Sequence, residues 1–240
     1  MKIMKLEPSA HRQGRWLVWF EDGSLLRVGE GDVVSLGLYA GKELSPEEAE
    51  RLSDAAGQGR VNARAVELLS RRPMSRRELV DKLSAPPRKR GRPGQGGDEM
   101  PREADPEALA QQREALRERA ERAADRMADL GLLNDEEYAA AVVRHYSAKG
   151  YGERRLRDEL YRRGVPREYW EGALSQREEA EGGEDGGSAI DRLLAQKLRG
   201  QELTRESLKR ACDYLARRGF GWEEISAAIE RARRQREAEE

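Results

Sequence analysis

The sequence predicts a mainly α-helical protein. Three tandem, helix-turn-helix-like repeats of three helices are expected to form an elongated, curved stack, preceded by a small N-terminal segment with a β-hairpin. Charged residues make up 38% of the 240 residues and aromatic residues only 5%, which argues against a single large apolar core. A phrase around Arg-Arg-Gly also occurs twice, as ELYRRGVPREYWEGAL from Glu159 and as YLARRGFGWEEISAAI from Tyr214.

The N-terminal segment, residues 1–58, is expected to contain a small β-sheet. β-Favouring residues cluster in KIMKLEP and RWLVWFEDGSLLRVG, and the Asp22-Gly23 pair in the second stretch is a strong hairpin signal. The expected strands lie near residues 2–8, 14–21 and 24–28.

Two short helices are expected to complete this segment. The first covers residues 31–38. The second covers residues 44–56, where Ser45 is a good N-cap and Glu48 completes a capping box. After Gly59 the pattern is helical throughout, so the boundary of the segment is placed between residues 58 and 59.

The first repeat is expected at residues 59–133, with an interruption. Ser75 is a plausible N-cap of its second helix, and Gly131 is a natural stop for its third. Between these helices the stretch 86–105 is rich in Pro and Gly and basic at its start, which is typical of a loop or disordered insertion. The expected helices are at residues 61–71, 75–84 and 106–130.

The second and third repeats are expected at residues 134–178 and 188–236, joined by a Gly-rich linker at 179–187. In the second repeat, Asn134 caps the first helix and Gly150 ends it. The third repeat reads as three helical stretches, AIDRLLAQKLRG, TRESLKRACDYLARRG and GWEEISAAIERARRQ.

The two copies of the phrase align at positions that a helix–turn–helix unit needs. The matches are apolar residues of one helical face and a glycine, which tolerates a positive φ at a helix end. They pair Leu160 with Leu215, Arg163 with Arg218, Gly164 with Gly219, Val165 with Phe220, Trp170 with Ile225 and Leu174 with Ile229. The first repeat aligns with the second by pairing Leu79 with Leu156, Asp81 with Asp158 and Leu83 with Leu160.

The residue pattern gives no sign of catalysis, a cofactor or a metal ion. The histidines are His11 and His145, and no spacing places a nucleophile beside a general base. One cysteine cannot form a thiol cluster for a metal. The stretch GRPGQGG lacks the Gly-Lys-Ser/Thr ending of a phosphate-binding loop. We therefore expect a protein that is not an enzyme.

Cys212 is expected to be a core thiol, because Leu208 and Leu215 lie one turn away on the same helix. A single cysteine forms no internal disulfide, which favours a reduced, cytoplasmic setting. No apolar stretch approaches the roughly 18 residues of a membrane span. The net charge of −1 means that nucleic-acid binding would need a local basic patch.

Arginine is the main candidate for a functional residue, because Arg-Arg pairs occur at helix ends in every repeat. A row of guanidinium groups can bind phosphates or carboxylates through bidentate hydrogen bonds. Arginine near a helix C-terminus also complements the helix dipole, so a purely structural role stays open. The pairs are Arg71-Arg72, Arg76-Arg77, Arg154-Arg155, Arg162-Arg163 and Arg217-Arg218.

Two tryptophans near the Arg-Arg-Gly turns receive different interpretations. Trp170 aligns with Ile225, so we expect it in the core. Trp222 aligns with Arg167, which indicates an exposed position, and an exposed tryptophan can anchor a partner. The basic stretch RKRGRPG is either a nonspecific DNA contact or a solvated tether.

At several spaced motifs the sequence resembles the RecX family of regulators of the RecA recombinase. The motifs are GLYAGKELSPEEAERL (37–52), SRRELVDKL (75–83), LGLLNDEEYAAAVVR (130–144), KGYGERRLRDELYRRGV (149–165) and YLARRGFGWEEI (214–225). Two departures stand out. Pro86-Pro87 replaces the usual Lys/Arg-Gly turn, and Asn134-Asp135 replaces an Asp-Asp pair.

The resemblance implies a regulator, chiefly an inhibitor, that binds the groove of the RecA–DNA filament. It would modulate RecA's ATPase, strand-exchange and co-protease activities in DNA repair and the SOS response. ATP and magnesium would belong to RecA, and no cofactor or membrane is implied for this chain, which we expect to be a cytoplasmic monomer. The expected contacts with RecA or with single- or double-stranded DNA are the ten paired arginines and Trp222.

Two other functions stay open. The helix pairs and the stretch SRRELVDKLS also fit a helix-turn-helix transcription regulator, although no helix stands out with base-reading Asn or Gln residues. A helical-repeat scaffold for another protein is the second alternative.

Overall fold

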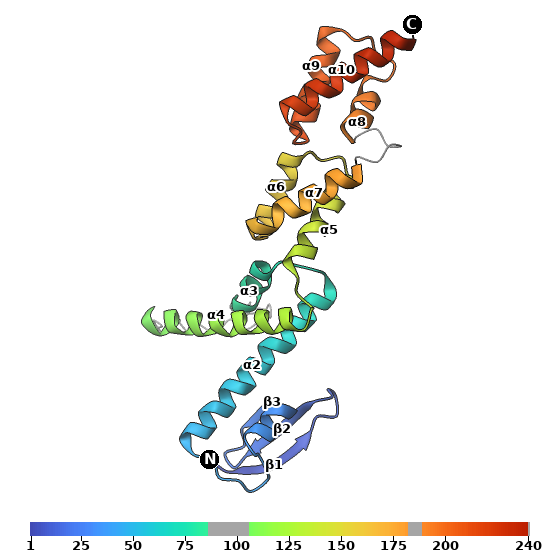
Figure 1. Cartoon of the computed structure of the whole chain (residues 1–240). Coiled ribbons are helices and arrows are strands. Elements are labelled where there is room, and N and C mark those ends of the chain that lie inside the picture. The colour runs from blue at the N-terminus through green and yellow to red at the C-terminus, as the bar shows by residue number, and fades with distance from the viewer. Residues whose placement is uncertain (86–105, 182–188, 240) are drawn as a thin grey trace, which may run out of the picture. The chain divides into compact units, whose positions relative to one another are not determined.

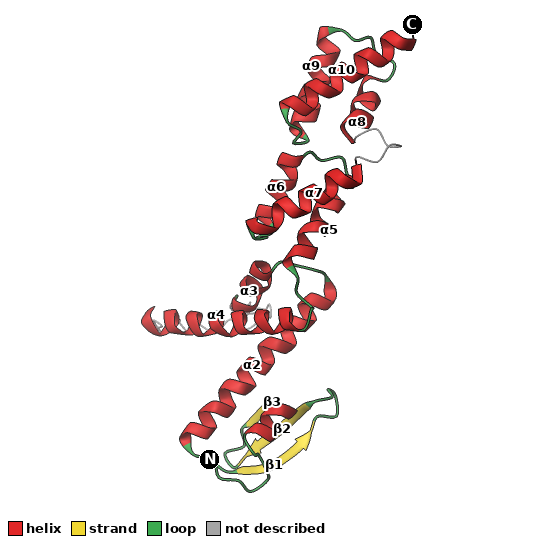
Figure 2. Ribbon diagram, in the orientation of Figure 1, coloured by secondary structure: helices red, strands yellow, loops and turns green. Residues whose placement is uncertain are grey.

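The structure is a computed structural model that describes residues 1–85, 106–181 and 189–239. The described residues form three β-strands and ten α-helices (Figure 1). The strands all lie in the N-terminal segment, and the rest of the described chain is helical (Figure 2). This confirms the predicted mainly α-helical fold with a small N-terminal β-sheet. The insertion at 86–105, with Pro86-Pro87 and RKRGRPG, and most of the expected linker lie outside the described residues.

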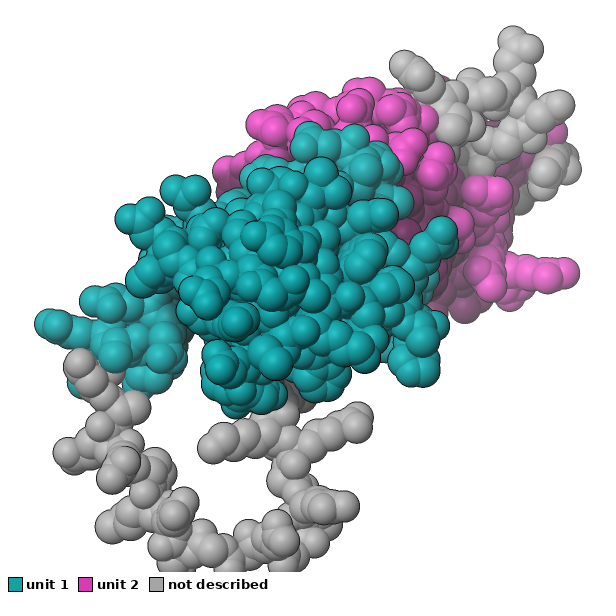
Figure 3. Space-filling model, turned by 90° about the horizontal axis from the view of Figure 1, so that it is seen from below, with its two compact units in different colours: residues 1–72, 79–132 teal, residues 73–78, 133–240 magenta. Residues whose placement is uncertain are grey.

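The chain divides into two compact units (Figure 3). Unit 1 comprises residues 1–72 and 79–132, and unit 2 comprises residues 73–78 and 133–240. Unit 2 therefore contains the second and third repeats together with the short stretch that begins the second helix of the first repeat. Among the described residues, no helix combines the length and the apolar character needed to cross a bilayer.

The N-terminal sheet is antiparallel, with the strand order β1-β2-β3. The strands are β1 (Ile3–Pro8), β2 (Arg15–Phe20) and β3 (Leu25–Gly29), close to the predicted positions. Val18 pairs with both Leu6 and Leu26, and alternate residues of the strands turn toward a common core. The expected hairpin joins β2 to β3, where the carboxylate of Asp22 accepts hydrogen bonds from the backbone and side chain of Ser24.

Helices α1 (Glu30–Ser35) and α2 (Pro46–Arg71) follow the sheet, and the first half of α2 packs on it through Leu52 and Ala56. The predicted capping box at Ser45 and Glu48 is present.

The division of this region into two helices was wrong. One helix, α2, runs without a break through residues 57–60, so the expected boundary at residue 58 falls inside a helix.

Helix α2 stays continuous because its glycines adopt ordinary helical geometry, and Gly57 has a packing role. Neither Gly57 nor Gly59 has a positive φ. A Cβ on Gly57 would lie 3.1 Å from the guanidinium of Arg119, which crosses the helix at this point. Arg119 belongs to α4 (Pro106–Asp129) and forms an ion pair of 2.8 Å with Asp54. Gly57 therefore marks a place where α4 packs closely on α2.

The second and third repeats each contain the three expected helices. The second has α5 (Asp135–Ala148), α6 (Glu153–Arg162), a short 3₁₀ turn at Arg167–Tyr169 and α7 (Trp170–Glu181). The third has α8 (Ala189–Leu198), α9 (Arg205–Arg217) and α10 (Trp222–Glu239). In the first repeat, α3 (Arg76–Ser84) lies between α2 and α4 in the chain, and Gly131 follows α4 with a φ of 67°.

Each of these two repeats has its own apolar core, built at the positions that the alignment predicts. Leu160 and Leu215 are fully buried, and Trp170 occupies the place of buried Ile225. Cys212 packs against the core of the third repeat, as expected for a structural thiol, and its partial burial raises the pKa of the thiol.

Candidate functional site: the Arg-Arg-Gly turns

Both Arg-Arg-Gly turns end a helix in the same way. Helix α6 ends at Arg162, and Gly164 follows with a φ of 68°, while α9 ends at Arg217, and Gly219 follows with a φ of 89°. In each turn the next amide bonds back to a carbonyl of the last helical turn, at 3.1 Å from Val165 and 3.2 Å from Phe220. This left-handed glycine geometry is the common way in which helices end.

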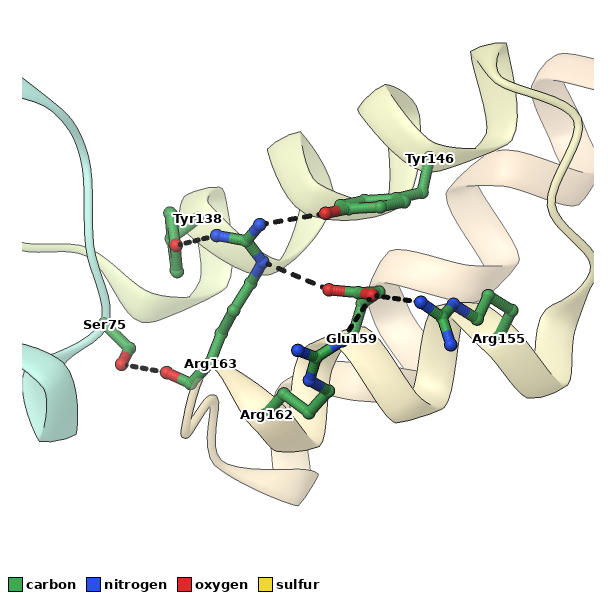
Figure 4. A network of polar contacts seen from close by, with 7 residues as sticks. All are labelled: Ser75, Tyr138, Tyr146, Arg155, Glu159, Arg162 and Arg163. Carbon is green, nitrogen blue, oxygen red and sulfur yellow. Dashed lines mark hydrogen bonds and ion pairs between the residues drawn. The ribbon is translucent and has the colours of Figure 1, made fainter.

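In the second repeat, the second arginine of the pair is held by polar contacts (Figure 4). The guanidinium of Arg163 donates hydrogen bonds to the hydroxyls of Tyr138 and Tyr146 at 3.0 and 3.1 Å. Both tyrosines lie on α5, so Arg163 fastens the end of α6 to that helix.

A buried carboxylate organises the arginines around this turn. Glu159 is only 5% exposed, and its carboxylate forms ion pairs with Arg155 at 3.0 Å, Arg162 at 3.2 Å and Arg163 at 3.9 Å (Figure 4). A buried charge is stable only when it is paired, so three guanidinium groups offset the desolvation of one carboxylate.

The first junction is the contact between residues 73–78 and the turn at Arg163 and Gly164. Ser75 is buried, and its hydroxyl accepts a hydrogen bond from the amide of Glu78, as predicted for an N-cap. The same hydroxyl donates a hydrogen bond to the carbonyl oxygen of Arg163 (Figure 4). One hydroxyl thus provides a hydrogen-bond partner both for an amide at the beginning of α3 and for a carbonyl at the end of α6.

A carboxylate completes the first junction. The amide of Arg76 donates a hydrogen bond of 2.8 Å to Asp135, the first residue of α5. Burial raises the pKa of Asp135, and the hydrogen bond and charge of Arg76 oppose that rise.

The second junction is the contact between residues 150–155 and the turn at Arg218 and Gly219. The amide of Gly152 donates to the carbonyl of Arg218 at 2.9 Å, and the amide of Arg154 donates to the carbonyl of Gly219 at 3.1 Å. In return, the guanidinium of Arg218 donates to the carbonyls of Lys149 and Gly150 at 2.6 and 3.2 Å. Free amides and carbonyls at three helix ends therefore satisfy one another.

Glycine is required on both sides of the second junction. A Cβ on Gly152 would lie 2.4 Å from the amide nitrogen of Phe220, and a Cβ on Gly219 would lie 2.6 Å from both Cβ and the amide nitrogen of Arg155. These neighbours are mostly backbone atoms, so they cannot move aside as a flexible side chain can.

In the third repeat, the second arginine is held between aromatic rings. The guanidinium of Arg218 lies 5.5 Å from the ring centre of Tyr151 and 5.1 Å from that of Tyr214. Such contacts are favourable for a cation at these distances.

The structure thus divides the two residues of these Arg-Arg pairs. Arg162 and Arg217 are exposed, whereas Arg163 and Arg218 are partly buried and engaged within the protein.

The other predicted contact residues are distributed over both units. In unit 2, Arg77 lies against Gly164, and Arg154 is exposed beside Arg155. Arg71 and Arg72 belong to unit 1, where Arg71 forms an ion pair with Glu67.

Trp222 is 72% exposed at the start of α10, as the alignment predicts. Within residues 1–85, 106–181 and 189–239, no three His, Cys, Asp or Glu side chains are grouped to hold a metal ion.

Sequence reasoning missed the partners of the arginines. Tyr138 and Tyr146 lie two turns apart on one face of α5, a spacing that marks them as a pair, but nothing in the sequence connects that pair to Arg163. Glu159 gives no signal, because its place in the third repeat is taken by Tyr214 and charged residues surround it in the sequence.

The fold and the junctions define a class of protein, in which three-helix repeats follow one another in the chain and residues at helix ends join one repeat to the next. A family model described as "RecX, second three-helix domain" matches residues 134–174. The chain is 31% identical over 170 residues to regulatory protein RecX of Pseudomonas entomophila, covering 70% of this chain and 89% of the relative. It is 35% identical over 166 residues to regulatory protein RecX of Xanthomonas axonopodis pv. citri, covering 69% and 83%.

The chain therefore belongs to the RecX family of regulatory proteins. Solved structures show the same fold. The crystal structure of a regulatory protein RecX aligns with a TM-score of 0.65 at 20% identity, covering 95% of this chain and 97% of that one. RecX from Lactobacillus salivarius aligns with a TM-score of 0.51 at 18% identity, covering 72% and 95%.

Proposed function

We propose that this chain regulates the RecA recombinase, chiefly as an inhibitor, by binding the RecA–DNA filament in the cytoplasm. It would modulate the ATPase, strand-exchange and co-protease activities of RecA in DNA repair and the SOS response. The observation that carries the proposal is membership of the RecX family, since identities of 31% and 35% extend over most of two relatives named regulatory protein RecX.

The geometry of unit 2 supports a binding role for the arginines. Arg162 and Arg217 stand at the same place in two successive repeats and are exposed. Their guanidinium groups suit phosphates or carboxylates on a partner. Arg163 and Arg218 would contribute indirectly in this proposal, by fixing the turn on which the first arginine stands.

An assay of RecA's DNA-dependent ATP hydrolysis tests the proposal. Substoichiometric amounts of the full chain are expected to lower the rate, and the chain is expected to sediment with RecA filaments formed on single-stranded DNA. An unchanged rate together with no sedimentation would contradict the proposal. A sequence-specific footprint on duplex DNA in the absence of RecA would favour a transcription regulator instead.

A further inference from the structure

A stripe of exposed residues runs along α6. It carries, in order, a cation, a carboxylate, an aromatic ring and a second cation, spaced so that all four lie on one side of the helix. We name Arg154, Asp158, Tyr161 and Arg162 the outer stripe of α6. The ring of Tyr161 is 64% exposed, so it is available to a partner.

Helix α9 carries the same charge order at the aligned positions. Its outer stripe consists of Lys209, Asp213, Ala216 and Arg217, all exposed. Only the aromatic residue is absent, since Ala216 stands where α6 has Tyr161. In the sequence of α3, Arg77 and Asp81 occupy the positions of the first cation and the carboxylate. Similar charges therefore recur at one place in the second helix of each repeat.

Folding accounts for little of this pattern. Arg162 pairs with Glu159, but Asp158 and Asp213 form no ion pair with any part of the chain that the structure describes. The apolar and glycine positions of the repeat are explained by the cores and the junctions. The recurring carboxylates Asp158 and Asp213 are exposed.

The central carboxylate argues against a nucleic-acid partner at this surface. A phosphate chain that approached the two cations of a stripe would meet Asp158 or Asp213 between them, and like charges at contact distance repel. A protein surface with a basic group between two acidic groups would complement all three charges. Tyr161 adds the kind of anchor that is enriched at the centres of protein interfaces.

We propose that the outer stripes of α6 and α9 are docking surfaces for protein, and that their partner is an assembly of identical subunits that repeats a basic group between two acidic ones. Two stripes with the same charge order fit a partner that presents the same group more than once. The inference deepens the proposed function and rests on it, because the RecA filament is the assembly used to test it.

The decisive variant exchanges two charges within one stripe. Arg154→Asp combined with Asp158→Arg keeps the net charge, so bulk attraction to DNA is unchanged, while the first two charges of the stripe change places. The backbone contact of Arg154 in the second junction does not depend on its side chain. We expect binding to RecA filaments to weaken about tenfold or more, while binding to naked single-stranded DNA changes by no more than about twofold.

A matched exchange elsewhere serves as the control. Glu230 and Arg234 form an exposed pair at 3.7 Å on α10, and exchanging them with Glu230→Arg and Arg234→Glu also keeps the net charge. This control is expected to bind the filament like the unmodified chain. Tyr161→Ala is a second test that changes no charge and is expected to weaken filament binding several-fold. Circular dichroism establishes that each variant is folded.

The outcomes separate the two proposals. If the unmodified chain does not bind the filament, both are overturned. If it binds, and the exchange within the stripe and Tyr161→Ala bind equally well, only the docking surface is overturned. A parallel loss of filament and naked-DNA binding would identify the stripe as a nucleic-acid contact and would also overturn it.

Discussion

The two junctions in unit 2 join equivalent parts of successive repeats by different means. At the first junction, the side chain of Ser75 reaches the carbonyl of Arg163. At the second, the aligned residue is Gly152, and its backbone amide reaches the carbonyl of Arg218 directly. The serine junction keeps a side chain between two backbones, whereas the glycine junction brings the backbones into contact.

The groups that hold the arginine after each helix also differ between side chains and backbone. Arg163 depends on tyrosine hydroxyls and a buried carboxylate, while Arg218 depends on backbone carbonyls and the faces of Tyr151 and Tyr214. A repeat can therefore keep its geometry while it changes the chemistry that fixes it. Both turns keep a glycine because each requires a positive φ, whereas the groups that hold the preceding arginine differ between the two turns.

Gly219→Ala is expected to have the largest effect, because it alters the backbone contact. The left-handed φ costs about 1–2 kcal/mol, and displacing the backbone of Arg155 costs about 1–3 kcal/mol more. Unfolding in urea, followed by circular dichroism, gives the total. Hydrogen exchange at the amides of Gly152 and Arg154 is expected to accelerate, because both amides bond across this junction.

Two alanine variants sharpen this comparison. Gly200 has a φ of 70°, and an added Cβ there would contact no other atom. Gly200→Ala therefore measures the cost of the left-handed backbone conformation alone. Gly164→Ala would meet the Arg77 side chain, with Cδ at 2.7 Å and Cβ at 3.0 Å, and is expected to cost more than Gly200→Ala but less than Gly219→Ala, which meets backbone atoms. If Gly219→Ala cost no more than Gly200→Ala, the close contact at the second junction would be disproved.

Ser75→Ala is expected to have the next largest effect, on the first junction. It removes the N-cap of α3 and leaves the carbonyl of Arg163 without its buried donor, a loss of about 2 kcal/mol in the free energy of unfolding. Thr204→Ala is the matched control, because Thr204 caps α9 at an exposed position. The control is expected to cost about 1 kcal/mol. Equal losses in urea denaturation would mean that the bond to Arg163 adds nothing.

Asp135→Asn is expected to change the pH dependence of stability more than stability itself. Because the pKa of Asp135 is raised above 3.8, the folded state holds its proton more tightly than the unfolded state. The free energy of unfolding is therefore larger at pH values below 3.8, and it falls as the pH rises through the raised pKa of Asp135. Asn keeps an oxygen for the amide of Arg76 and does not titrate, so this fall is expected to disappear. Asp158→Asn, at an exposed position, controls for the lost charge, and a pH profile like that of the unmodified chain would contradict the prediction.

Arg162→Gln with Arg217→Gln is expected to have the smallest effect on stability, within about 1 kcal/mol, because both side chains are largely solvated and Arg155 and Arg163 still pair with Glu159. Glutamine is preferable to glutamate because Arg162 lies 3.2 Å from the carboxylate of Glu159. In the proposed function, binding to RecA filaments weakens and becomes less sensitive to salt, which sedimentation at two salt concentrations measures. Arg210→Gln is the control. Unchanged binding would leave these two arginines with a helix-end role only.

Local signals predicted the fold well. The hairpin at Asp22-Gly23, the caps at Ser45, Ser75 and Asn134, and the glycine stops each depend on a few neighbouring residues, and the structure confirms them. The pattern failed around Gly57, because α2 runs on through this glycine, beside the guanidinium of Arg119 from a distant part of the chain.

The candidate site could be predicted only in part for the same reason. The recurrence of Arg-Arg-Gly located both turns, and alignment placed Trp222 at the surface. The division of each pair into an exposed and an engaged arginine depends on Tyr138, Tyr146 and the carbonyls of residues 149 and 150. Those contacts are set by packing, and no residue spacing encodes them.

The unbroken helix α2 packs against both the N-terminal sheet and α4 of the first repeat. At about 1.5 Å per residue its 26 residues extend over about 39 Å. The contacts with the sheet, at Leu52 and Ala56, alternate along the helix with the contacts to Arg119 of α4, at Asp54 and Gly57. Adding or removing one residue in this stretch would rotate the following part of α2 by about 100° relative to the preceding part, so the two sets of contacts could not form together. The contacts with the sheet and those with α4 thus depend on the same helical register of α2. Surface substitutions in α2 keep that register, and a single-residue insertion or deletion does not.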